Sequence, residues 1–115
     1  MDCIFCKIVS KEIPAKVVYE NDKILAFYDI NPIASEHILI IPKKHISSID
    51  NISDTDKDIS AALFEAVREI AKLKGMQDVG YRIIINNGKA AGQEVFHLHL
   101  HLVGGEKNLG PMLSL

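Results

Sequence analysis

Three of the five histidines in this 115-residue chain stand at alternate positions near its C-terminal end. They are His97, His99 and His101, and leucines separate them. Successive side chains on a β-strand point to opposite faces, so the imidazoles are expected on one face and the leucines on the other. The leucine face can pack on a core, whereas a row of imidazoles costs more to bury than aliphatic side chains do. The pattern therefore predicts chemistry on the histidine face.

The spacing of this row limits what it can bind. Same-face neighbours on a strand lie about 6.5–7 Å apart, and the outer pair about twice as far. Metal–nitrogen bonds are about 2 Å long, so one straight strand places three histidines around a single ion only with difficulty. We expect the histidines to serve different partners. The alternative is a hydrogen-bonded histidine ladder on the surface of a sheet.

A second group of chemically capable residues is the pair Cys3 and Cys6, in a C-x-x-C spacing. Alone, this spacing is compatible with a metal site, with unligated thiols or with a redox pair. The chain begins Met1-Asp2-Cys3 and shows no signal peptide, so we expect a cytoplasmic protein. In a reducing compartment, thiols or metal ligands are favoured over a disulfide.

Composition narrows the class of protein. Hydrophobic residues make up 48% and charged residues 24%, with a net charge of −2. We expect a single globular domain over residues 1–115. No basic face is indicated, which argues against a nucleic-acid partner. No apolar stretch approaches the roughly 18 residues that a membrane span needs, which argues against a membrane partner.

The elements that position these residues follow from periodicity and turn signals. We expect a short helix over 4–13, hairpin strands over 17–20 and 24–29, a well-covered third strand over 37–42, a long helix over 53–74, and strands over 81–86 and 96–103. The fold class predicted is α+β: a five-stranded, mainly antiparallel sheet with one long helix and a short N-terminal helix.

Residues 97–103 match the pattern His-φ-His-φ-His-φ-φ, where φ is apolar, and resemble the histidine-triad (HIT) superfamily. Further segments look like its Hint branch, in the same order: 27–32, 37–45, 86–88 and 92–93. The resemblance runs from about Cys3 to about Gly105. It implies a HIT-like fold, purine nucleotide binding and cleavage at the α-phosphorus. It also implies a homodimer through the long helix and the fourth strand, with the tail near Pro111-Met112-Leu113 approaching the partner's site.

The resemblance assigns roles to three histidines. His99 is expected to be the nucleophile, with its other ring nitrogen donating to the carbonyl of His97. His101 contacts the phosphate and helps to protonate the leaving group. His37 relays a proton, or alternatively is a structural histidine bonded to a neighbouring strand. The activity expected is that of a Hint-type nucleoside phosphoramidase or nucleotide hydrolase, working through a nucleotidyl-histidine intermediate.

The resemblance also implies a nucleotide site. Its base slot is apolar, with little to distinguish adenine from guanine, and is formed by Phe5, Ile8, Phe27, Ile30 and Leu39. Asp29 accepts from both ribose hydroxyls, and Asn86 bonds near the scissile bond. Gly92, Gln93 and Glu94 turn backbone N–H groups toward the phosphate. Many members of the branch have Ser or Thr at the position of Glu94, and a carboxylate there favours a cationic leaving group.

In part of the superfamily two cysteines, a histidine and the first triad histidine hold a structural zinc. The matching residues here are Cys3, Cys6, His45 and His97, a set that suits tetrahedral Zn²⁺. No organic cofactor is expected. Two rivals remain: a nucleotide-sensing or protein-interaction module with slow turnover, and a metalloenzyme with catalytic zinc. A site with four protein ligands leaves no position for water, which argues against the second rival.

Overall fold

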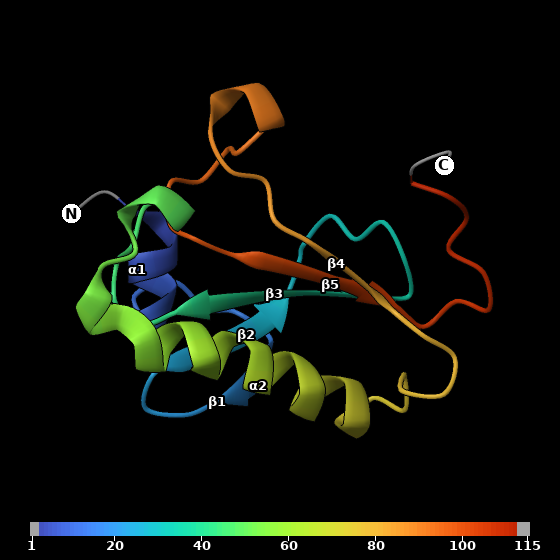
Figure 1. Cartoon of the computed structure of the whole chain (residues 1–115). Helices are drawn as coiled ribbons and strands as arrows, with labels where there is room; N and C mark the ends of the chain where they lie inside the picture. Colours follow the sequence, from blue (N-terminus) through green and yellow to red (C-terminus); the bar gives the residue numbers. More distant parts are fainter. Residues whose placement is uncertain (1–2, 113–115) are drawn as a thin grey trace.

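An antiparallel sheet forms the frame of this protein in a computed structural model, which describes residues 3–112 (Figure 1). Within that range five strands lie in the order β1-β2-β3-β5-β4. Their bounds are Val17–Glu20 for β1, Ile24–Tyr28 for β2, Glu36–Pro42 for β3, Arg82–Ile84 for β4 and Leu100–Gly104 for β5. A short helix α1 spans Ile4–Val9 and a long helix α2 spans Lys57–Leu73. This arrangement confirms the predicted fold class.

Helices α1 and α2 pack on opposite faces of the sheet. Successive side chains of a strand point to opposite faces, so each helix contacts every second residue. On β2 and β3, Ile24, Ala26, Ile38 and Ile40 join the cluster that contains the buried residues of α2. The residues between them, Leu25, Phe27, Leu39 and Ile41, cluster with Phe5 and Ile8 of α1. Leu98, Leu100 and Leu102 lie in the α2 cluster. The predicted leucine face therefore packs on the core, and the histidines face the α1 side.

Helix α2 begins later than its sequence suggests. Residues Asp54–Asp56 form a 3₁₀ turn, and the α-helix follows from Lys57 to Leu73. The carboxylate of Asp56, only 2% exposed, accepts from the Ser53 N–H and hydroxyl at 3.0 Å and from Lys44 Nζ at 2.7 Å. Lys44 holds the pKa of this carboxyl below its ordinary value. This cap ties the start of the helix to the segment after β3.

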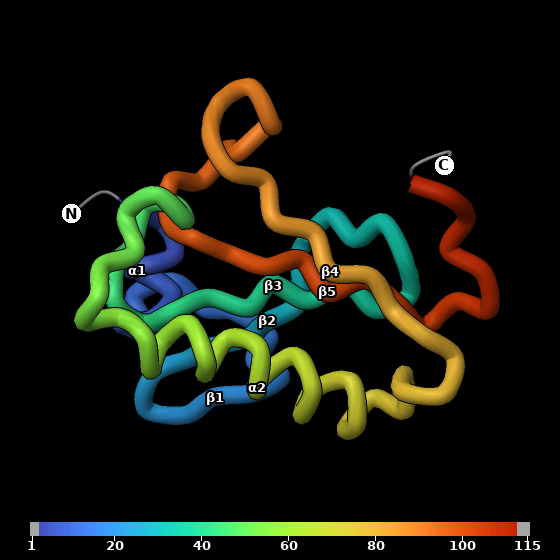
Figure 2. Tube along the Cα trace, viewed as in Figure 1, coloured from blue at the N-terminus to red at the C-terminus, as the bar shows by residue number. Residues whose placement is uncertain are grey.

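The histidine segment is only partly in the sheet, which corrects the expected strand over 96–103. Strand β5 begins at Leu100, opposite Ile40, although β3 continues to Pro42 beside β2. Residues before it bond instead to the chain leaving β3: Leu98 N–H donates to the Ile46 carbonyl at 2.7 Å. Figure 2 shows this end of the molecule, where α1, the segment after β3 and the segment leading into β5 meet. Strand β4 is also shorter than expected, and α1 ends at Val9.

Helix α2 leaves apolar groups exposed, with Phe64 at 61% and Leu73 at 64%, and the residues of the edge strand β4 are half-buried. The homodimer expected through these elements stays a prediction. The expectation for the tail includes Leu113, which lies outside the described residues. Among the helices described, none is long and apolar enough to cross a bilayer.

Candidate functional site

The hydrogen bonds of His99 decide which of its ring nitrogens can react. Its Nδ1 lies 2.7 Å from the carbonyl oxygen of His97. A carbonyl only accepts, so Nδ1 carries the hydrogen and donates, which leaves the lone pair of a neutral ring on Nε2. The side chain is 8% exposed, and the Phe5 ring lies edge-on at 5.2 Å between ring centroids. His99 therefore offers an oriented nitrogen nucleophile.

A second chain of bonds sets the hydrogens of His37 and His101. The Ile33 N–H donates to His37 Nδ1 at 3.2 Å, so a neutral His37 carries its hydrogen on Nε2. That Nε2 lies 2.9 Å from His101 Nδ1, which therefore accepts. The remaining hydrogen of a neutral His101 is on Nε2. The chain ends in a ring N–H donor that can be offered to a bound anion.

Burial keeps His101 in this neutral form. Burial lowers the pKa of His101 below its ordinary value of 6.5, and the neighbouring rings of His99 and His37 lower it further. The carboxylate of Asp29 acts in the opposite direction. His101 is consequently a hydrogen-bond donor near neutral pH rather than a standing positive charge.

This burial makes stability depend on pH. Between the lowered pKa of His101 and its ordinary value of 6.5, the unfolded chain binds more protons than the folded one. We expect the free energy of unfolding to fall as the pH is lowered through about 6.5, and to fall less steeply in His101→Asn. Urea titrations of both proteins between about pH 5 and pH 8 measure the two slopes. If the free energy of unfolding depended on pH equally in both proteins, the folded state would not disfavour protonation of His101.

His99 and His101 open into a cavity of about 860 Å³ on the α1 face of the sheet. All but one of the residues predicted to contact a nucleotide line it: Phe5, Ile8, Phe27, Asp29, Ile30, Leu39, Asn86, Gly92, Glu94, His99 and His101. Residues not predicted also line it: Ile4, Ile13, Pro14, Ala15, Lys16, Tyr28, Asn31 and Val95. Four of these, residues 13–16, belong to the loop between α1 and β1. His37 is 4% exposed and lies behind His101.

Asp29 combines a turn contact with a place in the cavity. Its Oδ1 accepts from the Asn31 N–H at 2.8 Å, which holds the turn after β2. Its Oδ2 lies 3.5 Å from His37 Nε2. Asp29 also lines the cavity, and its carboxylate has further lone pairs that a ligand could use. A capping role and a ligand role are therefore compatible in this one carboxylate.

The loop after β4 was expected to turn the backbone N–H groups of Gly92, Gln93 and Glu94 toward a phosphate. Two of these groups instead donate within the loop. The Gly92 N–H donates to the Lys89 carbonyl at 3.0 Å, and the Gln93 N–H to the Gly88 carbonyl at 3.1 Å. The Gln93 side chain is buried and bonds to Gly88, Ser47 and Val95. The side chain of Gln93 therefore holds the loop in place through hydrogen bonds to backbone groups. It is not among the residues that line the cavity.

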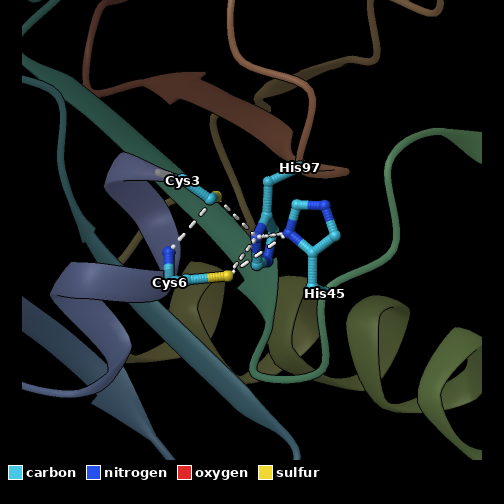
Figure 3. Close-up of side chains that lie close together, drawn as sticks. All are labelled: Cys3, Cys6, His45 and His97. Atoms are coloured by element: carbon cyan, nitrogen blue, oxygen red, sulfur yellow. Dashed lines mark hydrogen bonds between the residues drawn. The ribbon is translucent and has the colours of Figure 1, made fainter. Parts of the chain in front are cut away.

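The second group of predicted residues, Cys3, Cys6, His45 and His97, comes together in one cluster (Figure 3). Cys3 Sγ lies 3.3 Å from His97 Nδ1, and Cys6 Sγ lies 3.3 Å from His45 Nδ1 and 3.6 Å from His97 Nδ1. The two Nδ1 atoms are 3.2 Å apart. Helix α1 supplies the sulfurs, while the chain after β3 and the segment before β5 supply the nitrogens.

These positions fit a tetrahedral ion. With zinc–nitrogen and zinc–sulfur bonds of about 2.0 and 2.3 Å, donor atoms would lie about 3.3–3.8 Å apart. His97 is also in the required tautomer, because its Nε2 donates to the Pro42 carbonyl at 2.7 Å and leaves the Nδ1 lone pair toward the cysteines. Burial lowers the pKa of His97 and raises that of Cys6. A bound ion would offset the cost of ionising the Cys6 thiol here.

A further His/Asp group, formed by Asp29, His37 and His101, is less suited to a metal. The nitrogen that His37 would offer is Nε2, which carries hydrogen while Nδ1 accepts from Ile33. An ion bound at Nε2 would shift that hydrogen to Nδ1. The Nδ1–H and the Ile33 N–H would then be two hydrogen-bond donors facing each other. The group therefore fits a hydrogen-bond chain better than a metal site.

Comparisons with known proteins agree with this geometry. A family model described as "HIT domain" matches residues 10–108. The chain is 48% identical over 103 residues to Protein HitA of Neisseria gonorrhoeae, covering 90% of this chain and 95% of that protein. It is 42% identical over 113 residues to the purine nucleoside phosphoramidase of Escherichia coli K12, covering 98% and 94%.

Solved structures give the same result. A histidine triad protein from Clostridium difficile superposes with a TM-score of 0.91 at 49% identity, covering 96% of each chain. A HIT family hydrolase from Legionella pneumophila Philadelphia 1 gives 0.88 at 48% identity, covering 91% of this chain and 94% of that one.

Proposed function

Because this chain belongs to the HIT family, we propose that it is a nucleotide-binding hydrolase that cleaves purine nucleoside phosphoramidates or related nucleotide conjugates at the α-phosphorus. The observation that carries the proposal is the His99 Nδ1–H bond to the His97 carbonyl at 2.7 Å. It leaves Nε2 unprotonated in a cavity large enough for a nucleotide. The E. coli relative named as a phosphoramidase supports this choice of substrate class.

The reaction proceeds in two displacements. In the first, the lone pair of His99 Nε2 forms a bond to phosphorus, the P–N bond breaks, and the leaving amine takes a proton that comes from water. In the second, water attacks phosphorus, the bond to Nε2 breaks, and the proton from water is released. Both steps place negative charge on the phosphate oxygens, where a fixed N–H donor lowers the barrier.

His101 is proposed to be that donor. Its Nε2 hydrogen follows from the chain Ile33–His37–His101. If a neutral His101 gave this hydrogen away completely, it would become an imidazolate, which is unfavourable near neutral pH. We therefore assign His101 to hydrogen bonding of a phosphate oxygen rather than to protonation of the amine, and His37 to fixing the tautomer of His101.

The nucleotide conjugate lies along the cavity. The base is held between apolar side chains of α1 and β2, including Phe5 and Phe27. Such a slot provides stacking and few polar contacts to base edges, so adenine and guanine are both accepted. Glu94, exposed at the same cavity, favours a positively charged amine as the leaving group.

The test of this function is incubation of the purified protein with adenosine 5′-phosphoramidates of cationic, neutral and anionic amines, with AMP release measured for each. We expect release from all three and the highest kcat/KM for the cationic amine. If no AMP is released from any of them, the proposed reaction is wrong. If AMP is released but the order of the amines is reversed, only the role of Glu94 is wrong.

Asp29 is proposed to bind the ribose hydroxyls. In Asp29→Asn the side-chain oxygen can still hold the turn to Asn31, while the charged acceptor is lost. We expect AMP to bind about tenfold more weakly, and 2′-deoxy-AMP, which offers only the 3′-hydroxyl, to lose clearly less affinity. Calorimetric titration with both nucleotides measures the difference. An equal loss for the two nucleotides would refute the contact with the 2′-hydroxyl.

Cys3, Cys6, His45 and His97 are proposed to hold a structural zinc ion. The donor set and its spacing support zinc, and four protein ligands leave no open position for a reacting water. When bound, the ion cross-links α1 to the histidine segment. Elemental analysis is expected to give one zinc per chain for the wild type and much less for Cys3→Ser. A metal-free wild type purified without chelators would remove the ion from this account.

A further inference from the structure

Helix α1 carries residues of two different sites. Cys3 at its N-terminal end and Cys6 in its first turn belong to the metal cluster. Phe5 and Ile8, from the same helix, line the cavity proposed for the nucleotide base. The six-residue length of α1 is too short for a helix to be stable by itself. Its position must therefore come from its contacts.

Those contacts are of two kinds. On the sheet side, Phe5 and Ile8 pack with four side chains of β2 and β3. The second kind involves the two sulfurs, which lie within 3.3–3.6 Å of the ring nitrogens of His45 and His97. The apolar contacts are non-directional, whereas bonds to an ion fix distance and angle. An ion at the cluster would thus set the orientation of the helix.

Phe5 lies between the two sites. Its ring is edge-on to His97 at 5.8 Å, to His99 at 5.2 Å and to Phe27 at 5.6 Å between centroids, and it is 6% exposed. Since Cys3 and Cys6 flank Phe5 in the chain, a small rotation of α1 moves this ring within the base slot. The wall of the slot is therefore only as well ordered as the helix.

We propose that Cys3 and Cys6 are positioning residues for the nucleotide cavity: zinc held by the Cys3/Cys6/His45/His97 cluster fixes α1 and with it Phe5 and Ile8, so that zinc and purine nucleotide bind with positive coupling. The proposal rests on the nucleotide site of the proposed function. By thermodynamic linkage, the nucleotide must raise the affinity for zinc by the same factor by which zinc raises the affinity for the nucleotide.

The coupling acts on binding and leaves the chemical step almost untouched. The His97 ring is 0% exposed, and its Nε2 is held by the Pro42 carbonyl independently of any ion. The carbonyl of His97 therefore keeps its bond to His99 Nδ1 when the ion is removed. Removal of zinc should raise KM and leave kcat nearly constant, whereas partial unfolding would lower kcat and leave KM unchanged.

The experiment measures the Kd of AMP by calorimetry for wild-type protein loaded with zinc, stripped with a chelator, and reloaded. We expect stripping to weaken binding by about 5- to 50-fold and reloading to restore it. The double variant Cys3→Ser/Cys6→Ser should bind AMP as weakly as the stripped wild type and respond to neither chelator nor zinc. Lys7→Ser, a change in α1 that removes no ligand, should retain the full response to zinc.

Two further readouts decide the interpretation. Hydrogen exchange should become faster in residues 4–9 of the stripped protein while α2 and the central strands stay protected. A chelator competition should show that AMP tightens zinc binding by the factor found in the calorimetry. Equal AMP affinity with and without zinc would overturn the coupling alone, as would loss of protection throughout the sheet. Absence of AMP binding to the zinc-loaded wild type would overturn the nucleotide site as well.

Discussion

Replacing His99 by alanine is expected to lower kcat for an adenosine phosphoramidate by about 10⁴-fold or more. The Nε2 lone pair of this ring is the group proposed to bond to phosphorus, and its orientation depends on the 2.7 Å bond from Nδ1 to the His97 carbonyl. The other histidine at the cavity, His101, cannot substitute, because its Nε2 carries hydrogen in the chain described above. Steady-state release of AMP measures the loss.

The matched control is His99→Asn. Asparagine can still donate an N–H toward the His97 carbonyl, but it has no nucleophilic nitrogen, so its activity should be as low as that of the alanine variant. Substrate labelled at phosphorus and quenched during turnover should leave label on the wild-type protein and none on either variant. Undiminished turnover in His99→Ala, or substantial turnover in His99→Asn, would show that the role of His99 is structural.

Replacing His101 by alanine is expected to lower kcat by about 10²–10³-fold, the usual effect of removing one donor to a developing oxyanion. The factor should be nearly the same for phosphoramidates of strongly and weakly basic amines. This uniformity follows from the assignment of His101 as a donor to a phosphate oxygen, which the Ile33–His37–His101 bonds support. Measuring kcat over a series of amines for wild type and variant tests it.

The opposite pattern would identify a different role. If the loss in His101→Ala grew steeply with the basicity of the leaving amine, His101 would be the general acid that protonates it. His37→Ala provides a second comparison, since it leaves the His101 ring in place but frees its tautomer. We expect a smaller loss in His37→Ala than in His101→Ala, and an equal loss would mean that the pair acts as a unit.

Much of the fold could be predicted from local patterns. The alternation of His97, Leu98 and His99 predicted leucines on a core and histidines on the other face. The leucines lie in the α2 cluster, and Phe5 of α1 contacts His99. The nearly continuous apolar run of β3 gave its central position in the sheet. Boundaries were less predictable, because they depend on partners distant in the chain: the pairing of β5 with β3 begins at Leu100, and Leu98 bonds to Ile46 instead.

The candidate site also has some residues that the sequence predicted and others that it did not. Residue types and the family pattern led to the histidines, Asp29, and the Cys/His set that the structure brings together. The side chain of Gln93 bonds to backbone groups and is not among the residues that line the cavity, and the sequence did not indicate these partners. The loop residues 13–16 at the cavity were missed because nothing in their own pattern indicates a ligand.

By itself, the sequence determined the chemical groups of this protein and the faces of the strands that carry them, since side-chain chemistry and a period of two are local properties. Only the tertiary structure decided which ring nitrogen is free in His97 and His101. That depends on carbonyls and N–H groups distant in the chain, such as Pro42 for His97 and Ile33 for His101 through His37. It also decided that α1 carries both sulfurs and part of the base wall, because folding brings His45, His97 and the cavity to the same short helix.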